Sequence, residues 1–183
     1  MTQSKKLDLE EKVAAYFDEL DTLPKAEKAI LKRNAGNLLR ESRGGSLGIF
    51  YKTLPPGVLR SQEDIWFAVA TLYTLTKARL SNEDVNLRVQ TNFGWTLRRV
   101  FQEGPRPENQ DVKLRALLDS ACDTQNGFFF HQLRKLVRLA DSRGVPVNWP
   151  KLLVDLIRWN SPQRQVQKEW AREYYSPVKE KEE

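Results

Sequence analysis

The sequence predicts an all-α protein with two helical parts, of which the C-terminal one is a compact four-helix bundle. Three observations support this fold class. Apolar residues recur at helical spacing along most of the 183-residue chain. Capping residues and prolines precede several of these segments, as they commonly do at helix starts. No two alternating segments are joined by the short glycine- or asparagine-containing turn of a hairpin, so nothing favours a sheet.

Two helices are expected before residue 45. The first is amphipathic, because four apolar residues follow one another at spacings of three and four: Leu9, Val13, Phe17 and Leu20. The second begins near Pro24, since proline fits the first turn of a helix. It extends along the apolar residues as far as Leu39, with Gly36 as a weak point.

One short and two longer helices are expected next. The stretch GGSLGIFYKTLPPG indicates a short helix or turn that ends at two prolines. Ser61 is the predicted N-cap of a helix that runs to Arg79, because two acidic residues follow in its first turn. Residues 81–91 show no clear periodicity. The stretch NFGWTLRRVFQE, from Asn92 to Glu103, forms the following helix.

The stretch QEGPRPENQD at residues 102–111 has the strongest turn-forming composition in the chain and predicts a domain boundary. Four helices are expected after it, near 110–122, 127–142, 148–159 and 162–175. Asn148 and Ser161 are the predicted N-caps of the last two, each with a proline in the next turn. The expected parts are an N-terminal helical domain at 1–104, a C-terminal bundle at 105–175 and a charged tail at 176–183.

Helical spacing also predicts the core. The expected core residues are Phe67, Leu72, Leu97, Val100, Leu117, Leu118, Leu133, Leu136, Val137, Leu152, Leu156 and Trp170. At least two of the tryptophans at 149, 159 and 170 are expected to serve the core rather than to stack on a ligand, and Trp159 is the undecided one.

The composition favours a non-catalytic protein. One histidine and one cysteine leave no ligand set for a multi-histidine cage or a zinc finger. Neither a glycine-rich phosphate loop nor a nucleophile elbow occurs. His131 could serve as a lone general base, but a solvated helix face is the simpler interpretation. With no apolar run of membrane-spanning length and no secretory signal, we expect a cytoplasmic protein without cofactor or membrane contact.

Positive charge is concentrated in two regions. The net charge is +6, and residues 24–60 carry eight Lys and Arg against two acids, while residues 92–175 carry fourteen against nine. Such clustering indicates a polyanion as the first candidate partner and an acidic protein surface as the second.

The stretch HQLRKLVRL at residues 131–139 places its cations on one helical face, which contains His131, Arg134, Lys135 and Arg138. Pairs of opposite charge at this spacing would stabilise the helix better, so the absence of acids requires an explanation. The face is either a binding surface or simply solvated. On the helix at 92–103, Trp95 shares a face with two arginines, which suits single-stranded nucleic acid. Packing of Trp95 against a neighbouring helix or subunit is the alternative.

The last part of the chain resembles a known family. The segment LRKLVRLADSRGVPVNWPKLLVDLIRWNSPQRQVQKEWAREYY (133–175) is similar to the C-terminal region of CasB, the small subunit of the type I-E CRISPR Cascade complex. The stretches GIFYKTLP and NFGWTLRRVF are similar to earlier family segments, although a smaller or polar residue often stands at the position of Trp95. The similarity is dense over 92–175 and patchy over 25–80.

This resemblance implies a non-catalytic, all-helical subunit of a crRNA-guided surveillance complex in antiviral defence. Such subunits lie in pairs along the crRNA-bound filament, contact a CasA-like large subunit and CasC-like backbone subunits, and help hold the target and displaced DNA strands of the R-loop. By family position, the nucleic-acid-binding residues are Arg33, Lys113, Arg134, Lys135 and Arg164. Face geometry alone adds Arg98, Arg99 and Arg138.

Two other interpretations stay open. In the first, the protein is an interaction scaffold whose basic faces meet acidic subunit surfaces rather than DNA or RNA. In the second, it is a stand-alone RNA-binding or RNA-processing protein.

Overall fold

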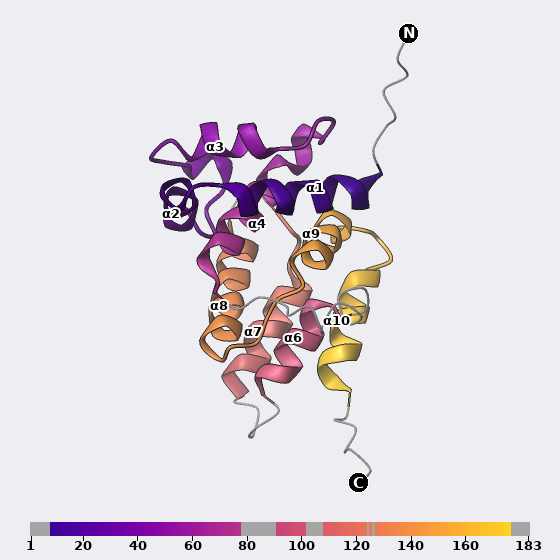
Figure 1. The fold of residues 1–183 in the computed structure, drawn as a ribbon. Coiled ribbons are helices and arrows are strands. Elements are labelled where there is room, and N and C mark those ends of the chain that lie inside the picture. The colour runs from indigo at the N-terminus through magenta and orange to yellow at the C-terminus, as the bar shows by residue number, and fades with distance from the viewer. Residues whose placement is uncertain (1–7, 78–90, 102–107, 124, 126, 177–183) are drawn as a thin grey trace. The chain divides into compact units, whose positions relative to one another are not determined.

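The computed structural model describes residues 8–77, 91–101, 108–123, 125 and 127–176. Every regular element in these ranges is a helix (Figure 1), so the predicted all-α fold is confirmed. The chain divides into two compact units, Met1–Leu75 and Thr76–Glu183. No helix in the described ranges combines the length and the apolar character needed to cross a lipid bilayer.

The first unit is built around one apolar helix. Its described elements are α1 (Leu9–Thr22), α2 (Lys25–Arg33), η1 (Leu39–Glu41), α3 (Ser46–Thr53), η2 (Arg60–Gln62) and α4 (Glu63–Leu75). All residues of α4 from Ile65 to Tyr73 are buried, so this helix forms the centre of the unit. The Tyr16 hydroxyl of α1 donates a hydrogen bond of 3.2 Å to the carbonyl of Trp66.

Two helices of this unit are shorter than predicted. Helix α2 ends at Arg33 rather than near Leu39, because Gly36 adopts a left-handed conformation with φ of 82°. Ser61 is not an N-cap: it lies within η2, and α4 begins at Glu63 with the two predicted acids in its first turn. Helix α4 ends at Leu75, and the predicted end at residue 79 lies outside the described residues.

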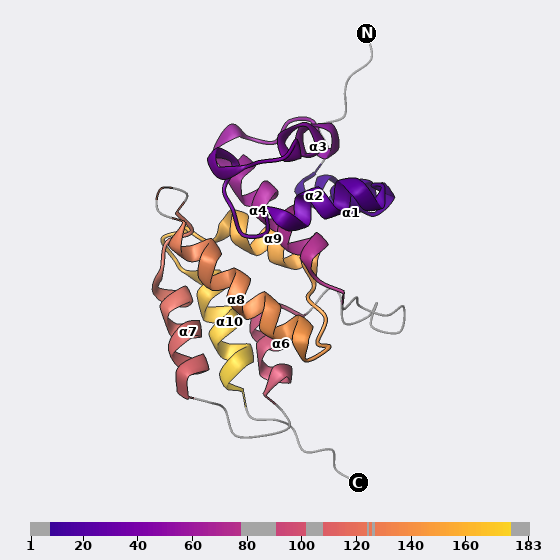
Figure 2. The same ribbon diagram turned by 90° about the vertical axis from the view of Figure 1, so that its left-hand side faces the viewer.

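The second unit contains α6 (Phe93–Val100), α7 (Glu108–Asp119), α8 (Phe128–Ser142), α9 (Trp149–Arg158) and α10 (Gln165–Tyr175) in its described part. Helix α8 lies beside α6 and α7, and α6 packs closely along α10 (Figure 2). The structure therefore places α6 in the C-terminal unit, whereas the sequence placed it in an N-terminal domain at 1–104. The turn-forming stretch at 102–111 joins two helices of one unit, and the units divide after Leu75 instead.

A chain of aromatic rings holds the second unit together. Phe93 of α6 packs against Trp170 of α10 with ring centroids 5.2 Å apart. Trp170 contacts Trp159 at 4.8 Å, and Trp159 contacts Phe129 of α8 at 5.0 Å. All the predicted core residues are buried, and so is Trp149. The three tryptophans at 149, 159 and 170 therefore all belong to the core, including the undecided Trp159.

Two helices of this unit approach each other closely at Gly94. A Cβ atom placed on Gly94 would lie 2.1 Å from the carbonyl oxygen of Trp170. No side chain fits in that space, so α6 and α10 can meet at this distance only with glycine at this position.

One of the two predicted caps in this unit is correct. The Asn148 side chain accepts a hydrogen bond of 3.2 Å from the backbone N–H of Lys151 and caps α9. Ser161 does not cap α10, because this helix begins only at Gln165 after an Arg164 with φ of 51°. The Ser161 hydroxyl instead pairs with the side chain of Gln163 at 2.6 Å.

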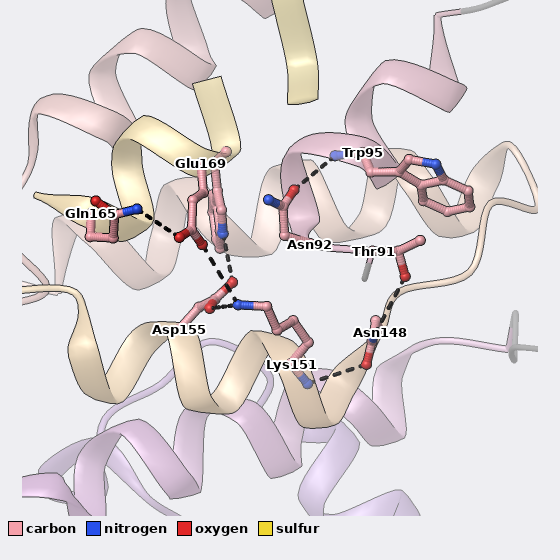
Figure 3. A network of polar contacts seen from close by, with 9 residues as sticks. Thr91, Asn92, Trp95, Asn148, Lys151, Asp155, Gln165 and Glu169 are labelled. Atoms are coloured by element: carbon pink, nitrogen blue, oxygen red, sulfur yellow. Dashed lines mark hydrogen bonds and ion pairs between the residues drawn. The ribbon is translucent and has the colours of Figure 1, made fainter. Parts of the chain in front are cut away.

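A buried carboxylate joins α9 to α10 (Figure 3). Asp155 is 1% exposed and accepts a hydrogen bond of 2.8 Å from the indole N–H of Trp170. It also forms an ion pair with Lys151, whose Nζ lies 4.0 Å from Glu169 of α10. Burial raises the pKa of the Asp155 carboxyl above its ordinary value of 3.8, although hydrogen bonds from Lys151 and Trp170 act in the opposite direction.

We expect Gly94→Ala to lower the free energy of unfolding by about 3 kcal/mol, because the new methyl group would push apart two packed backbones. Chemical denaturation of the purified chain measures this change. Gly48→Ala is the matched control: Gly48 lies in α3 with open space around it, so its replacement should leave stability unchanged or raise it by up to about 1 kcal/mol. Equal effects of the two substitutions would contradict the close approach.

The raised pKa of Asp155 makes the stability of the fold depend on pH. The folded carboxyl binds its proton more tightly than the unfolded one, so its stabilising contribution is complete below the unfolded pKa and is lost as pH rises through the folded pKa. We compare the free energy of unfolding of the wild type with that of Asp155→Asn. We expect the difference, wild type minus variant, to fall as pH rises from 3.8. Denaturation of both proteins at several pH values tests this. A relative stability that rises over the window would mean that the pKa is depressed.

Candidate nucleic-acid interface

Helix α8 has the predicted division into an apolar and a basic side. Gly127 precedes it in a left-handed conformation with φ of 70°. The buried side consists of Phe129, Phe130, Leu133, Leu136, Val137 and Ala140. These side chains fix the rotation of the helix, because turning it would expose them to water. The predicted facing is therefore confirmed.

The opposite side of α8 is cationic, and we call its four residues, His131, Arg134, Lys135 and Arg138, the α8 basic face. His131, Lys135 and Arg138 are exposed, and Arg134 is half-buried at the edge of the row. No acid occurs in α8 before Asp141, whose carboxylate accepts a hydrogen bond of 2.6 Å from the backbone N–H of Lys77. Within the described ranges, no carboxylate forms an ion pair with Arg134, Lys135 or Arg138.

Sequence reasoning overlooked Arg143, which directly follows α8. It is exposed and forms the C-cap of the helix, so it adds a cation at the C-terminal end of α8. Cations at this position also interact favourably with the helix dipole. The available signal was the position of this arginine directly after the helix predicted at 127–142.

The two arginines of α6 have different surroundings. The side chain of Arg98 is 18% exposed, and its Nη2 lies 3.9 Å from Glu173 of α10. Arg99 is exposed and places its guanidinium over the indole of Trp95, with Cζ 4.9 Å from the ring centroid. Arg98 therefore serves α6–α10 packing, while Arg99 remains at the surface.

Arg164 also contacts its own unit. Its Nη2 donates a hydrogen bond of 2.8 Å to the carbonyl of Leu118 and lies 3.2 Å from Asp119. Because the last carbonyls of a helix lack partners within the helix, Arg164 stabilises the end of α7. Lys113 is half-buried on the same helix, which packs against α8.

Arg33 is the predicted site residue in the first unit. It is exposed in the last turn of α2, next to Lys32. The other predicted residues all belong to the second unit, where Arg134, Lys135 and Arg138 share one helix face.

The described residues provide no cluster of three or more His, Cys, Asp or Glu that could hold a metal ion. Burial raises the pKa of the Cys122 thiol to about 12, so it stays protonated at neutral pH and is a poor nucleophile. The α8 basic face can contact phosphates, because such contacts require positive charge and long side chains rather than base-specific geometry.

Comparisons with known proteins identify the family of this chain. Residues 27–175 match the sequence profile of CRISPR-associated protein Cse2. A CRISPR-associated protein Cse2 from Thermus thermophilus is 34% identical over 124 residues, which span 67% of this chain and 63% of that relative's length.

Solved structures share the fold. The crystal structure of M. ruber CasB has a TM-score of 0.71 at 23% identity, covering 93% of this chain and 94% of that one. A chain of a CRISPR RNA-guided surveillance complex has a TM-score of 0.70 at 20% identity, covering 91% and 93%. The resemblance to CasB is thereby confirmed, and the chain belongs to the family of CRISPR-associated protein Cse2.

Proposed function

We propose that this chain is a non-catalytic small subunit of a type I-E crRNA-guided surveillance complex, and that its α8 basic face binds nucleic-acid backbones in the R-loop. Family membership and the shared fold support the assignment to such a complex. The observation that carries the nucleic-acid contact is the α8 basic face itself, because its cations have no carboxylate partner among the described residues.

The energetics of R-loop formation explain how a basic helix face would act there. Guide–target pairing replaces one duplex with another of similar stability, so protein contacts to the backbones can shift the balance. Arg134 and Lys135 are adjacent, and Arg138 follows one turn later, so one phosphate-bearing strand can meet all three. These contacts stabilise a strand whatever its sequence.

The proposed partners are the crRNA–DNA R-loop, a CasA-like large subunit, CasC-like backbone subunits and a second copy of this chain, all in the cytoplasm. Exposed apolar side chains in the first unit favour contacts with protein subunits. Leu47 and Tyr51 lie one turn apart on α3, and Leu59 precedes η2. Such protein contacts are part of the proposed function, and they are all that the alternative function requires, a scaffold that meets other subunits without touching DNA or RNA.

We expect Arg134→Ala combined with Lys135→Ala to weaken DNA binding by the assembled complex for all sequences. The plot of log affinity against log salt concentration should become shallower by about 0.7 for each single-strand phosphate that the variant no longer neutralises. Stability should change by no more than about 0.5 kcal/mol, because the substitutions lie outside the core. Fluorescence anisotropy with labelled DNA over a salt series measures both affinity and slope.

The matched control removes two exposed cations from another helix of the same unit, Lys168→Ala with Arg172→Ala on α10. This pair changes the net charge equally, so a specific role of the α8 basic face requires a larger effect from the α8 substitutions. Unchanged R-loop formation and salt dependence in the α8 variant would mean that the face is merely solvated. Loss of complex assembly with normal DNA contacts would support the scaffold instead.

A further inference from the structure

Trp95 differs from the other tryptophans of the chain. The indoles at 66, 149, 159 and 170 are buried, and three of them belong to the second unit's core. Trp95 is half-exposed on α6, on the side turned away from the buried residues Phe93 and Leu97. A large aromatic side chain at the surface gains less from burial than a core residue, so packing accounts for only part of its presence.

Trp95 is held by one contact of its backbone and one contact of its side chain. The Asn92 side chain accepts a hydrogen bond of 3.1 Å from the backbone N–H of Trp95 and so anchors the first turn of α6 (Figure 3). The indole points away from the Asp155–Lys151–Glu169 network in the same view. One turn later, the guanidinium of Arg99 lies over the ring, with Cζ 4.9 Å from its centroid. This cation–π contact holds both planar groups in place at the surface.

The charge of Arg99 is available to a ligand. Arg98, the preceding residue, has Glu173 at 3.9 Å, whereas Arg99 makes no ion pair with any carboxylate in the described ranges. Of these two adjacent arginines, Arg98 therefore contributes to helix packing, whereas the charge of Arg99 can bind a ligand.

We propose that Trp95 and Arg99 form a stacking site for an unpaired base of single-stranded nucleic acid, with Arg99 also contacting an adjacent phosphate. This inference rests on the proposed function, in which the chain meets nucleic acid in an R-loop, and adds base stacking to its backbone contacts. Indole and guanidinium planes both stack on bases, and every base has a π face, so the site accepts any sequence. A preoriented pair loses little conformational freedom when the base arrives.

The test compares two oligonucleotides with equal numbers of phosphates, a ten-residue oligothymidylate and a ten-residue strand of abasic sites. Both are titrated into the full chain at low salt and followed by fluorescence anisotropy. We expect the oligothymidylate to bind more tightly by roughly 5- to 150-fold, the range for one stacked base. It should also quench tryptophan emission, because Trp95 is the half-exposed indole while the other four are buried.

Three variants test whether Trp95 causes the difference in affinity and the quenching. Trp95→Ala should bring the two affinities together, while Trp95→Phe should keep most of the difference and abolish the quenching. Tyr175→Ala, which removes an exposed aromatic side chain from α10 of the same unit, should keep both the difference and the quenching. Thermal unfolding of each variant shows whether the fold is intact, and Trp95→Phe provides the test if Trp95→Ala does not fold.

The outcomes separate the two proposals. Equal binding of both oligonucleotides by the wild type, with a normal salt dependence, would overturn the stacking site and leave the backbone contacts of the α8 basic face in place. An unchanged difference in Trp95→Ala, or an equal decrease in Tyr175→Ala, would also overturn it. Failure of the wild type to bind either strand at low salt would overturn the proposed function together with this inference.

Discussion

The close contact between α6 and α10 is the constraint on which the second unit depends. Gly94 lets the backbone of α6 approach Trp170, and the ring chain from Phe93 through Trp170 and Trp159 to Phe129 extends this contact to α8. Because α8 is anchored at the end of this chain, its rotation follows from the packing of the aromatic rings. The same contact brings Arg98 to Glu173 and leaves the other side of α6 at the surface.

A polar link supplements this apolar one. Asp155 connects α9 to α10 through the indole of Trp170, and Lys151 lies between Asp155 and Glu169. A buried carboxylate costs free energy when its partners are imperfect, so such a group contributes more to the specificity of the arrangement than to its stability. Alternative packings in which α10 slides along α9 would remove the Trp170 indole donor and leave this carboxylate with Lys151 of its own helix.

The features that could be predicted from the sequence are those set by residues close to one another along the chain. The two sides of α8 follow from residue spacing alone, and the Asn148 cap bonds an amide three residues away. The Ser161 cap was wrong because a local turn satisfies that hydroxyl first, and α10 starts later. The boundary at 102–111 was misplaced because a turn-rich stretch indicates a loop, whereas the membership of α6 depends on its fit to a helix far along the chain.

The same distinction applies to the candidate site. Arg134, Lys135 and Arg138 could be grouped from one helix, and the structure places them on one side of it. The surroundings of Arg98 and Arg164 could not be predicted, because their partners, Glu173 and Leu118, are set by tertiary packing. Both residues remain predicted nucleic-acid contacts, but each already has a structural partner in its own unit.

The lack of acids within the first part of α8 also affects the free subunit. A row of cations without internal carboxylates draws its counter-ions from the surrounding solution, so small anions gather along the helix. A polyanion that docks there must displace them, and their return to bulk solvent adds entropy to the association. Small anions and a polyanion therefore compete for the α8 basic face, as they do for an anion-exchange resin. The affinity for the polyanion then depends on the kind of anion in the medium as well as on its concentration.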